Sequence, residues 1–99
     1  MTQIEFAPEV LTDIDEIFDH LAEYDPQNAS DRFATMIEAI DLLRHSPHIG
    51  RPVSDQRREL IIGRASHGYV ALYEYMEFID TVFVLAIRSQ REAGYFLGQ

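Results

Sequence analysis

Two stretches of apolar residues with helical spacing, joined by almost no connection, most constrain how this chain can fold. Over residues 8–24 the apolar side chains recur every three or four positions, and acidic residues occupy the opposite face. Asp25-Pro26 interrupts the pattern and predicts a new helix start, because Asp is a good N-cap and Pro a good first helical residue. A second helix is therefore expected from residue 26 to about residue 45. Two helices with so short a connection should form an antiparallel hairpin.

Segments with strand-like alternation lie on both sides of this hairpin. One short strand is expected before it, and three follow a loop at residues 46–57: Gln3–Phe6, then about Arg58–Ile62, Tyr69–Tyr75 and Thr81–Ile87. A turn around residues 77–80 makes the last two strands a hairpin. The order β-α-α-β-β-β predicts an α+β fold, with the N-terminal strand and helical hairpin packed on a small, mostly antiparallel sheet.

The last strand is apolar on both faces, which predicts a central position with cover on both sides. One face carries Val82, Val84 and Ala86, and the other carries Phe83, Leu85 and Ile87. The two helices should pack together on one face of the sheet, and the sequence supplies no third layer. Two explanations stay open: either the sheet curls on itself, or a partner covers its other face.

Length and composition indicate a single domain spanning residues 1–99. The chain has no cysteine, which excludes disulfides, thiol nucleophiles and thiolate metal sites. Its four histidines do not suggest a metal-ligand set, so neither a metal nor another cofactor is expected. No apolar run approaches the roughly 20 residues of a membrane span, and the N-terminus has no signal-peptide pattern. We therefore expect a cytoplasmic protein with no membrane association.

The formal net charge of −9 argues against non-specific binding to nucleic acid by the chain alone. Residues 1–50 carry 2 Arg and 11 acidic residues, whereas residues 51–99 carry 6 Arg and 6 acidic residues. Every basic residue is Arg, so the chain lacks the ammonium group that most readily serves as a basic general acid or base.

Several local strings, in this order and spacing, resemble the RelE/ParE superfamily of type II toxin–antitoxin toxins over nearly the whole chain. They are Phe6-Ala7-Pro8, Asp13-Ile14, Ile17, Ala29, Arg32-Phe33, Pro47-His48-Ile49-Gly50-Arg51-Pro52, Arg58-Glu59-Leu60, Gly68-Tyr69, Leu72-Tyr73, the run from Val82 to Arg88, and Gln90-Arg91-Glu92. The resemblance implies a toxin that is neutralised by tight binding of a cognate antitoxin, giving a hetero-oligomer.

In this superfamily the antitoxin wraps around the toxin and covers its sheet, which would supply the missing layer. On that basis we expect antitoxin-binding residues on the last two strands: Tyr69, Tyr73, Tyr75, Val82 and Val84. A row of Tyr on one strand face is also typical of half-buried packing, with the hydroxyl groups reaching water.

Two activities occur on this fold, and the fold cannot choose between them. RelE-like members cleave messenger RNA on the ribosome, whereas ParE-like members, associated with plasmid stabilisation, poison DNA gyrase without catalysing a reaction. If the chain is an endoribonuclease, the expected catalytic residues are Arg64, Arg88, Arg91 and Tyr95, and the other candidates are Arg51, Arg58 and the four His. The position between the two last Arg residues that often holds His in the family is Ser89 here, which removes an acid–base group suited to neutral pH. The ParE-like branch is therefore favoured, as a gyrase poison rather than an enzyme.

Expected target-binding residues are Arg88, Arg91, Tyr95 and Phe96, near the end of the chain. The alternative for the two Arg residues is that they bond backbone or acidic groups at the sheet edge. Arg51 is expected to anchor the loop after the second helix, with an acidic residue of the first helix as its partner. Two other functions stay open: a ribosome-dependent mRNA interferase, and a non-toxic module that only binds antitoxin.

Overall fold

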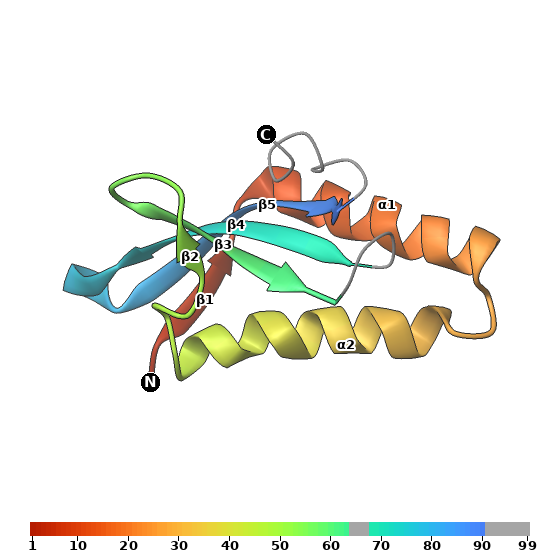
Figure 1. Ribbon diagram of the computed structural model, residues 1–99, viewed down its shortest axis with the longest axis horizontal. Coiled ribbons are helices and arrows are strands. Elements are labelled where there is room, and N and C mark those ends of the chain that lie inside the picture. Colours follow the sequence, from red (N-terminus) through yellow and green to blue (C-terminus); the bar gives the residue numbers. More distant parts are fainter. Residues whose placement is uncertain (64–67, 91–99) are drawn as a thin grey trace.

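Two helices lie side by side on one face of a five-stranded sheet in the computed structural model, which describes residues 1–63 and 68–90 (Figure 1). The helices and strands are β1 (Gln3–Phe6), α1 (Pro8–Tyr24), α2 (Ala29–Asp41), β2 (Arg51–Pro52), β3 (Arg57–Ile62), β4 (Tyr69–Met76) and β5 (Thr81–Ser89). Short 3₁₀ turns follow α2 and β4, as η1 (Leu42–Arg44) and η3 (Glu77–Ile79). The α+β class and the predicted order of elements are confirmed.

The strands follow the order β1-β5-β4-β3-β2, and only β1 runs parallel to its neighbour. β5 therefore lies between β1 and β4, inside the sheet as predicted. The segment expected to be a loop at residues 46–57 contains β2, which pairs with β3 through Arg51–Glu59 and Pro52–Arg58. Such a two-residue strand falls below what alternation in a sequence can signal.

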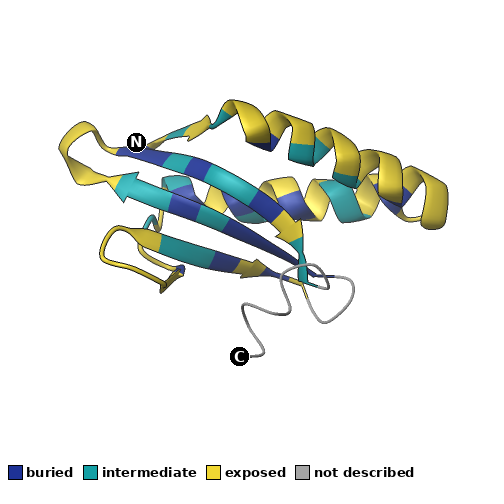
Figure 2. Cartoon of the chain, turned by 90° about the horizontal axis from the view of Figure 1, so that it is seen from above, coloured by how far each residue is buried: buried dark blue, intermediate teal, exposed yellow. Residues whose placement is uncertain are grey.

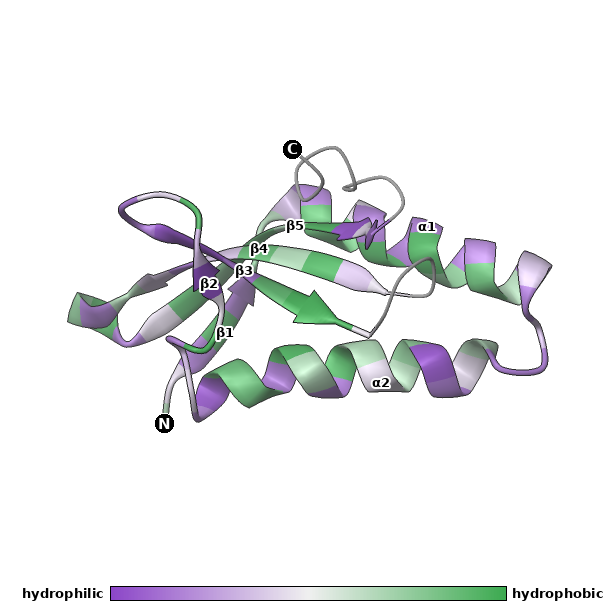
Figure 3. Cartoon of the chain, in the orientation of Figure 1, coloured by the Kyte–Doolittle hydropathy of each residue, from purple (hydrophilic) through white to green (hydrophobic). Residues whose placement is uncertain are grey.

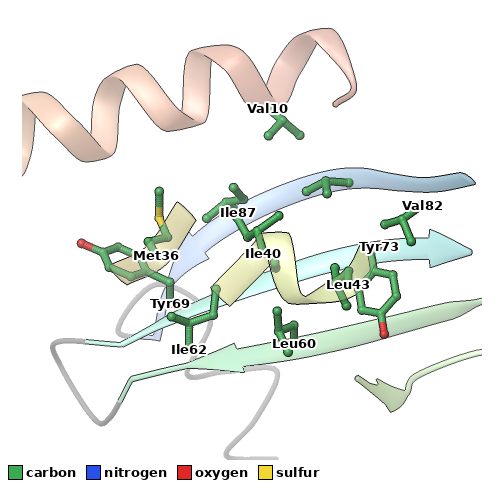
Figure 4. Packing of buried hydrophobic residues seen from close by; sticks show 12 residues of the cluster. Val10, Met36, Ile40, Leu43, Leu60, Ile62, Tyr69, Tyr73, Val82 and Ile87 are labelled. Atoms are coloured by element: carbon green, nitrogen blue, oxygen red, sulfur yellow. The ribbon is translucent and has the colours of Figure 1, made fainter. Parts of the chain in front are cut away.

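The hydrophobic core fills the space between the helices and one face of the sheet (Figure 4). It consists of Val10, Met36, Ile40, Leu43, Leu60, Ile62, Tyr69, Ala71, Tyr73, Val82, Val84 and Ile87. Apolar residues recur every three or four positions along both helices, between polar ones, so that each helix presents an apolar stripe toward the sheet (Figure 3). Both helices lie on the same side of the sheet, so the described elements form two layers (Figure 2).

A bulge in β5 changes which of its residues face the helices. Leu72 of β4 is opposite Ala86, but the next residue, Tyr73, is opposite Val84, so Leu85 has no partner. Alternation restarts beyond the extra residue, and Ile87, which is 1% exposed, joins the core. The prediction that Ala86 shares the face of Val82 and Val84, with Ile87 on the other face, was therefore wrong.

The second helix begins later than Asp25-Pro26 predicts. Asp25 ends α1, because its N–H donates to the Leu21 carbonyl at 2.8 Å. Its carboxylate accepts hydrogen bonds from Asn28 Nδ2 at 3.0 Å and Arg32 Nη1 at 3.1 Å, so it organises the connection between the helices. α2 starts at Ala29 and ends at Asp41, and η1 occupies the last turn of the predicted helix. None of the helices among the described residues combines the length and the apolar character that a membrane span requires.

Ile40 and Ile37 offer a matched test of this packing, because both are on α2 but are 2% and 38% exposed. We expect Ile40→Ala to lower the free energy of unfolding by about 2–5 kcal/mol, since it leaves a cavity under the sheet. Ile37→Ala makes the same change in helix propensity and should cost less than about 1 kcal/mol. Urea unfolding followed by circular dichroism measures both values, and equal losses would contradict this assignment of the core.

Candidate functional site

Four of the five residues expected to bind antitoxin lie in the interior. Tyr69, Tyr73, Val82 and Val84 are between 0% and 7% exposed, on the sheet face that the helices cover. Tyr75 is half-buried, and its hydroxyl donates to Asp80 Oδ1 at 2.7 Å. Alternation along the strands was predicted correctly up to the bulge, but the Tyr row faces the helices, so a partner cannot reach it without displacing them.

Tyr73 holds the loop between α2 and β2 from inside the core. Its hydroxyl donates to the Pro47 carbonyl at 2.7 Å and accepts from the Gly50 N–H at 2.9 Å. A Cβ on Gly50 would lie 2.6 Å from Tyr73 Cε1 and 2.8 Å from the Glu59 carbonyl oxygen, which leaves room only for glycine. The loop thus reaches the phenol because residue 50 has no side chain.

Both buried phenols stay protonated near neutral pH. Burial raises the pKa of Tyr73, although the hydrogen bond from the Gly50 N–H and the charge of Arg58 lower it in part. Burial likewise raises the pKa of Tyr69, with Arg32 acting in the opposite direction. Neither group is suited to accept a proton from a substrate.

Arg58 is the cation that anchors the loop backbone. Its Nη1 donates to the His48 carbonyl at 3.0 Å and the Gly50 carbonyl at 2.8 Å. Arg51, for which we predicted an acidic partner on the first helix, instead pairs with Glu59 of β3 at 2.9 Å. That prediction was wrong because β2 places Arg51 directly opposite Glu59 in the sheet.

Arg88 lies near the end of β5, where an acidic residue of α1 holds it. Its Nη1 donates to Asp13 Oδ2 at 2.7 Å and to the Ile87 carbonyl at 3.0 Å, and the side chain is 46% exposed. Asp13 Oδ2 also accepts from the Ile87 N–H at 3.3 Å. This carboxylate therefore bonds the edge of β5 beyond the end of β1. Arg88 in turn bonds an acidic group and a backbone carbonyl at this edge, which is the second of the two roles considered for it.

The part played by Asp13 was not predicted, although the sequence contains a signal for it. Asp13 falls three residues after Val10 and four before Ile17, a spacing that places it beside the apolar stripe of α1. An acidic side chain at the border of a core stripe needs a partner, and here the partner comes from β5.

The other predicted target-binding or catalytic residues, Arg64, Arg91, Tyr95 and Phe96, lie outside the described residues. Within residues 1–63 and 68–90, no group of three His, Asp or Glu side chains is placed to hold a metal ion. The described site is therefore Arg88, its partner Asp13 and the sheet face to which Arg88 belongs.

That sheet face is apolar in the middle and is not covered by either helix (Figure 2). Alternation places Ile61, Leu72 and Phe83 on it, opposite the core residues of the same strands. Ile61 is 43% exposed, and the other two are half-buried. We call this surface, with Leu85, Ala86 and Arg88, the open face.

Comparison with known proteins identifies the class to which this two-layer fold belongs. The family model described as the ParE toxin of the type II toxin-antitoxin system, parDE, matches residues 4–94. The chain therefore belongs to the ParE toxin family, as the resemblance in its sequence suggested. A search of curated proteins finds no match.

Two solved structures share the fold at low sequence identity. A chain of the chromosomal ParDE TA system from P. aeruginosa has a TM-score of 0.73 and 19% identity, covering 90% of this chain and 96% of its own. The E. coli toxin RelE, in the free state and with two Arg replaced by Ala, has a TM-score of 0.58 and 15% identity. This second match covers 97% of the present chain and 90% of RelE.

We expect Tyr73→Phe to lower the free energy of unfolding by about 1–3 kcal/mol, because it leaves the Pro47 carbonyl and the Gly50 N–H without their partner. Tyr24→Phe, at a side chain that is 69% exposed, is the matched control and should change stability by less than about 0.5 kcal/mol. Thermal and urea unfolding measure the difference, and a Tyr73→Phe protein as stable as the wild type would refute the anchoring role.

Proposed function

We propose that this type II toxin acts as a poison of DNA gyrase and that a cognate antitoxin neutralises it by covering the open face. The observation that carries the first part is the set of described contacts of Arg88, which hold a permanent positive charge in place and do not form a proton-transfer site. Its guanidinium is bonded to Asp13, the neighbouring residue is Ser89, and burial raises the pKa of the β4 phenols Tyr69 and Tyr73, which face the core. A guanidinium remains charged at physiological pH, so Arg88 is suited to binding an anionic or carbonyl group but not to moving protons.

Membership of the ParE family supports the gyrase target over messenger RNA. The similarity to RelE concerns the fold, and fold alone does not carry an activity. The chain also has no lysine and a formal net charge of −9, which does not favour a site that must bind the RNA backbone.

Purified full-length toxin should convert supercoiled plasmid to linear, protein-linked DNA in a reaction with gyrase and ATP that is stopped with detergent. Linear DNA accumulates if the toxin holds gyrase in its cleaved-DNA state. Reactions without toxin, without gyrase and with a known gyrase poison are the controls. If gyrase is unaffected by folded toxin that arrests growth, the proposal fails, and cleavage of messenger RNA on ribosomes becomes the function to measure.

Two variants in the same assay distinguish a target contact from a structural role for Arg88. Arg88→Ala removes the guanidinium, whereas Asp13→Ala removes its partner and leaves the guanidinium in place. If Arg88 contacts gyrase, Arg88→Ala should raise the toxin concentration needed for half-maximal linearisation by about tenfold or more, and Asp13→Ala should have a much smaller effect. Equal losses in the two variants would assign Arg88 to structure alone.

The open face is the surface that best fits the antitoxin. A partner segment can bury its apolar side chains against an apolar strip along neighbouring strands. Charged residues at the border of the strip can then fix the position of that segment. Arg57, Glu59 and Glu74 lie on this border, where they are exposed to half-buried. A partner here would also supply a layer on the side of the sheet that neither described helix covers.

Ile61→Asp should weaken antitoxin binding by about tenfold or more, because it places a charge in the middle of the apolar strip. Leu42→Asp is the matched control: Leu42 is 55% exposed but lies in η1, outside the open face. Calorimetric titration with the antitoxin encoded beside the toxin gene measures both affinities. Wild-type affinity in Ile61→Asp, or equal weakening in Leu42→Asp, would place the antitoxin elsewhere.

A further inference from the structure

The turn between β4 and β5 exposes large apolar side chains at the end of the molecule opposite the α1–α2 connection (Figure 1). Phe78 is 99% exposed, Ile79 53% and Met76 43%. A single exposed apolar residue is ordinary on a protein surface, but three together, one of them a completely exposed aromatic ring, are typical of a contact surface.

This tip, residues 76–80, is held in place by hydrogen bonds rather than free to collapse onto the sheet. Asp80 has a left-handed backbone conformation with φ of 49°, and its Oδ1 accepts from Thr2 Oγ1 and from Tyr75 Oη, both at 2.7 Å. The Asp80 carbonyl accepts from the Gln3 N–H at 3.0 Å, which ties the tip to β1. Phe78 is thus presented by a preorganised turn, so that binding through it costs little conformational entropy.

A hollow of about 380 Å³ lies directly beside the tip. Phe78 itself borders the hollow, and the rest of the wall combines apolar surface from Pro52, Met76 and the Tyr75 ring with the cationic side chain of Arg57. Arg57 is 53% exposed and lies 3.8 Å from Glu74, a loose ion pair that leaves its guanidinium accessible from the hollow. An aromatic ring entering this space would meet both an apolar wall and a cation that favours a π face.

We propose that the tip and the hollow join two copies of this chain around a twofold axis, with Phe78 of each copy in the hollow of the other. The protruding Phe78 side chain and the hollow are adjacent on one surface. A twofold axis beside them places each protruding ring against the hollow of the other copy. Glu77, beside Phe78, is 78% exposed and lies 3.8 Å from His48 Nε2 of its own chain. In the proposed dimer it would turn toward Arg57 of the second copy. This inference does not depend on the gyrase proposal.

Charge also permits this contact, although the whole chain carries −9. Two Arg and three acidic residues line the hollow, which gives it a local net charge of −1 with His neutral. Most of the negative charge therefore lies elsewhere, and a second copy is not strongly repelled at this surface. Because one aromatic ring per copy supplies most of the buried area, the dimer should be weak, with a dissociation constant on the order of 10–100 µM.

Sedimentation equilibrium of the full chain, purified free of antitoxin, tests the proposal over about 2–500 µM at 0.15 M salt. The wild type should rise from the mass of one chain to that of two. Phe78→Ala should remain a monomer throughout without a change in thermal stability, since its ring contacts solvent. Tyr24→Ala, an exposed aromatic residue at the opposite end of the molecule, is the matched control and should dimerise like the wild type.

A charge reversal makes the proposed contact specific. Glu77→Arg and Arg57→Glu should each weaken the dimer, and the double variant should recover it, because the pair is restored with opposite signs. A wild-type protein that stays monomeric over the whole range would overturn the proposal, as would a Phe78→Ala protein that dimerises normally. So would a double variant no tighter than the single ones. If the wild type is monomeric and Phe78→Ala loses binding to the antitoxin or to gyrase, the tip is a contact surface for that partner and not for a second copy.

Discussion

Packing of two helices against one face of a five-stranded sheet is the constraint on which the rest of this structure depends. The core contains Val10 from α1 and Met36 and Ile40 from α2, and the facing residues of β3, β4 and β5 complete it. Two helices have enough apolar surface for one side of such a sheet and no more. Neither helix covers the second face, and its apolar middle strip favours cover by another chain.

Periodicity was sufficient to predict both helices, four of the five strands, their order and the inner position of the last strand. It failed where structure depends on pairing. The bulge at Leu85 is a property of two strands, because it appears only when β5 is laid against β4, and it moves Ile87 into the core. Asp25-Pro26 was misread for another reason: the dipeptide is compatible with a helix start, but the Asp carboxylate here bonds Asn28 and Arg32 across the connection.

The site was harder to predict than the fold. Alternation shows which residues share a face but not which face the helices cover, so the row of Tyr69 and Tyr73 was assigned to a partner although it faces the core. A cue did exist in Gly50, whose missing side chain permits the hydroxyl of Tyr73 to reach the loop. The partner of Arg51 could not be found from sequence, since β2 has only two residues and its pairing with β3 leaves no periodic pattern. For Arg88, two roles were considered, contact with the target and a bond to an acidic or backbone group at the sheet edge. Its bond with Asp13 corresponds to the second.

The pairing register suggests how one surface could serve both the target and the antitoxin. Ile61 is opposite Val70, and Val70 is opposite Arg88, so these three residues form one row across β3, β4 and β5, in which Val70, 5% exposed, lies between two exposed residues. On the proposed function, an antitoxin that buries Ile61 lies within two strands, roughly 10 Å, of the guanidinium that contacts gyrase. It would then neutralise the toxin by occupying the surface, and the fold of the toxin would not have to change. Antitoxin and gyrase would exclude each other, and whichever of them is bound would cover the open face.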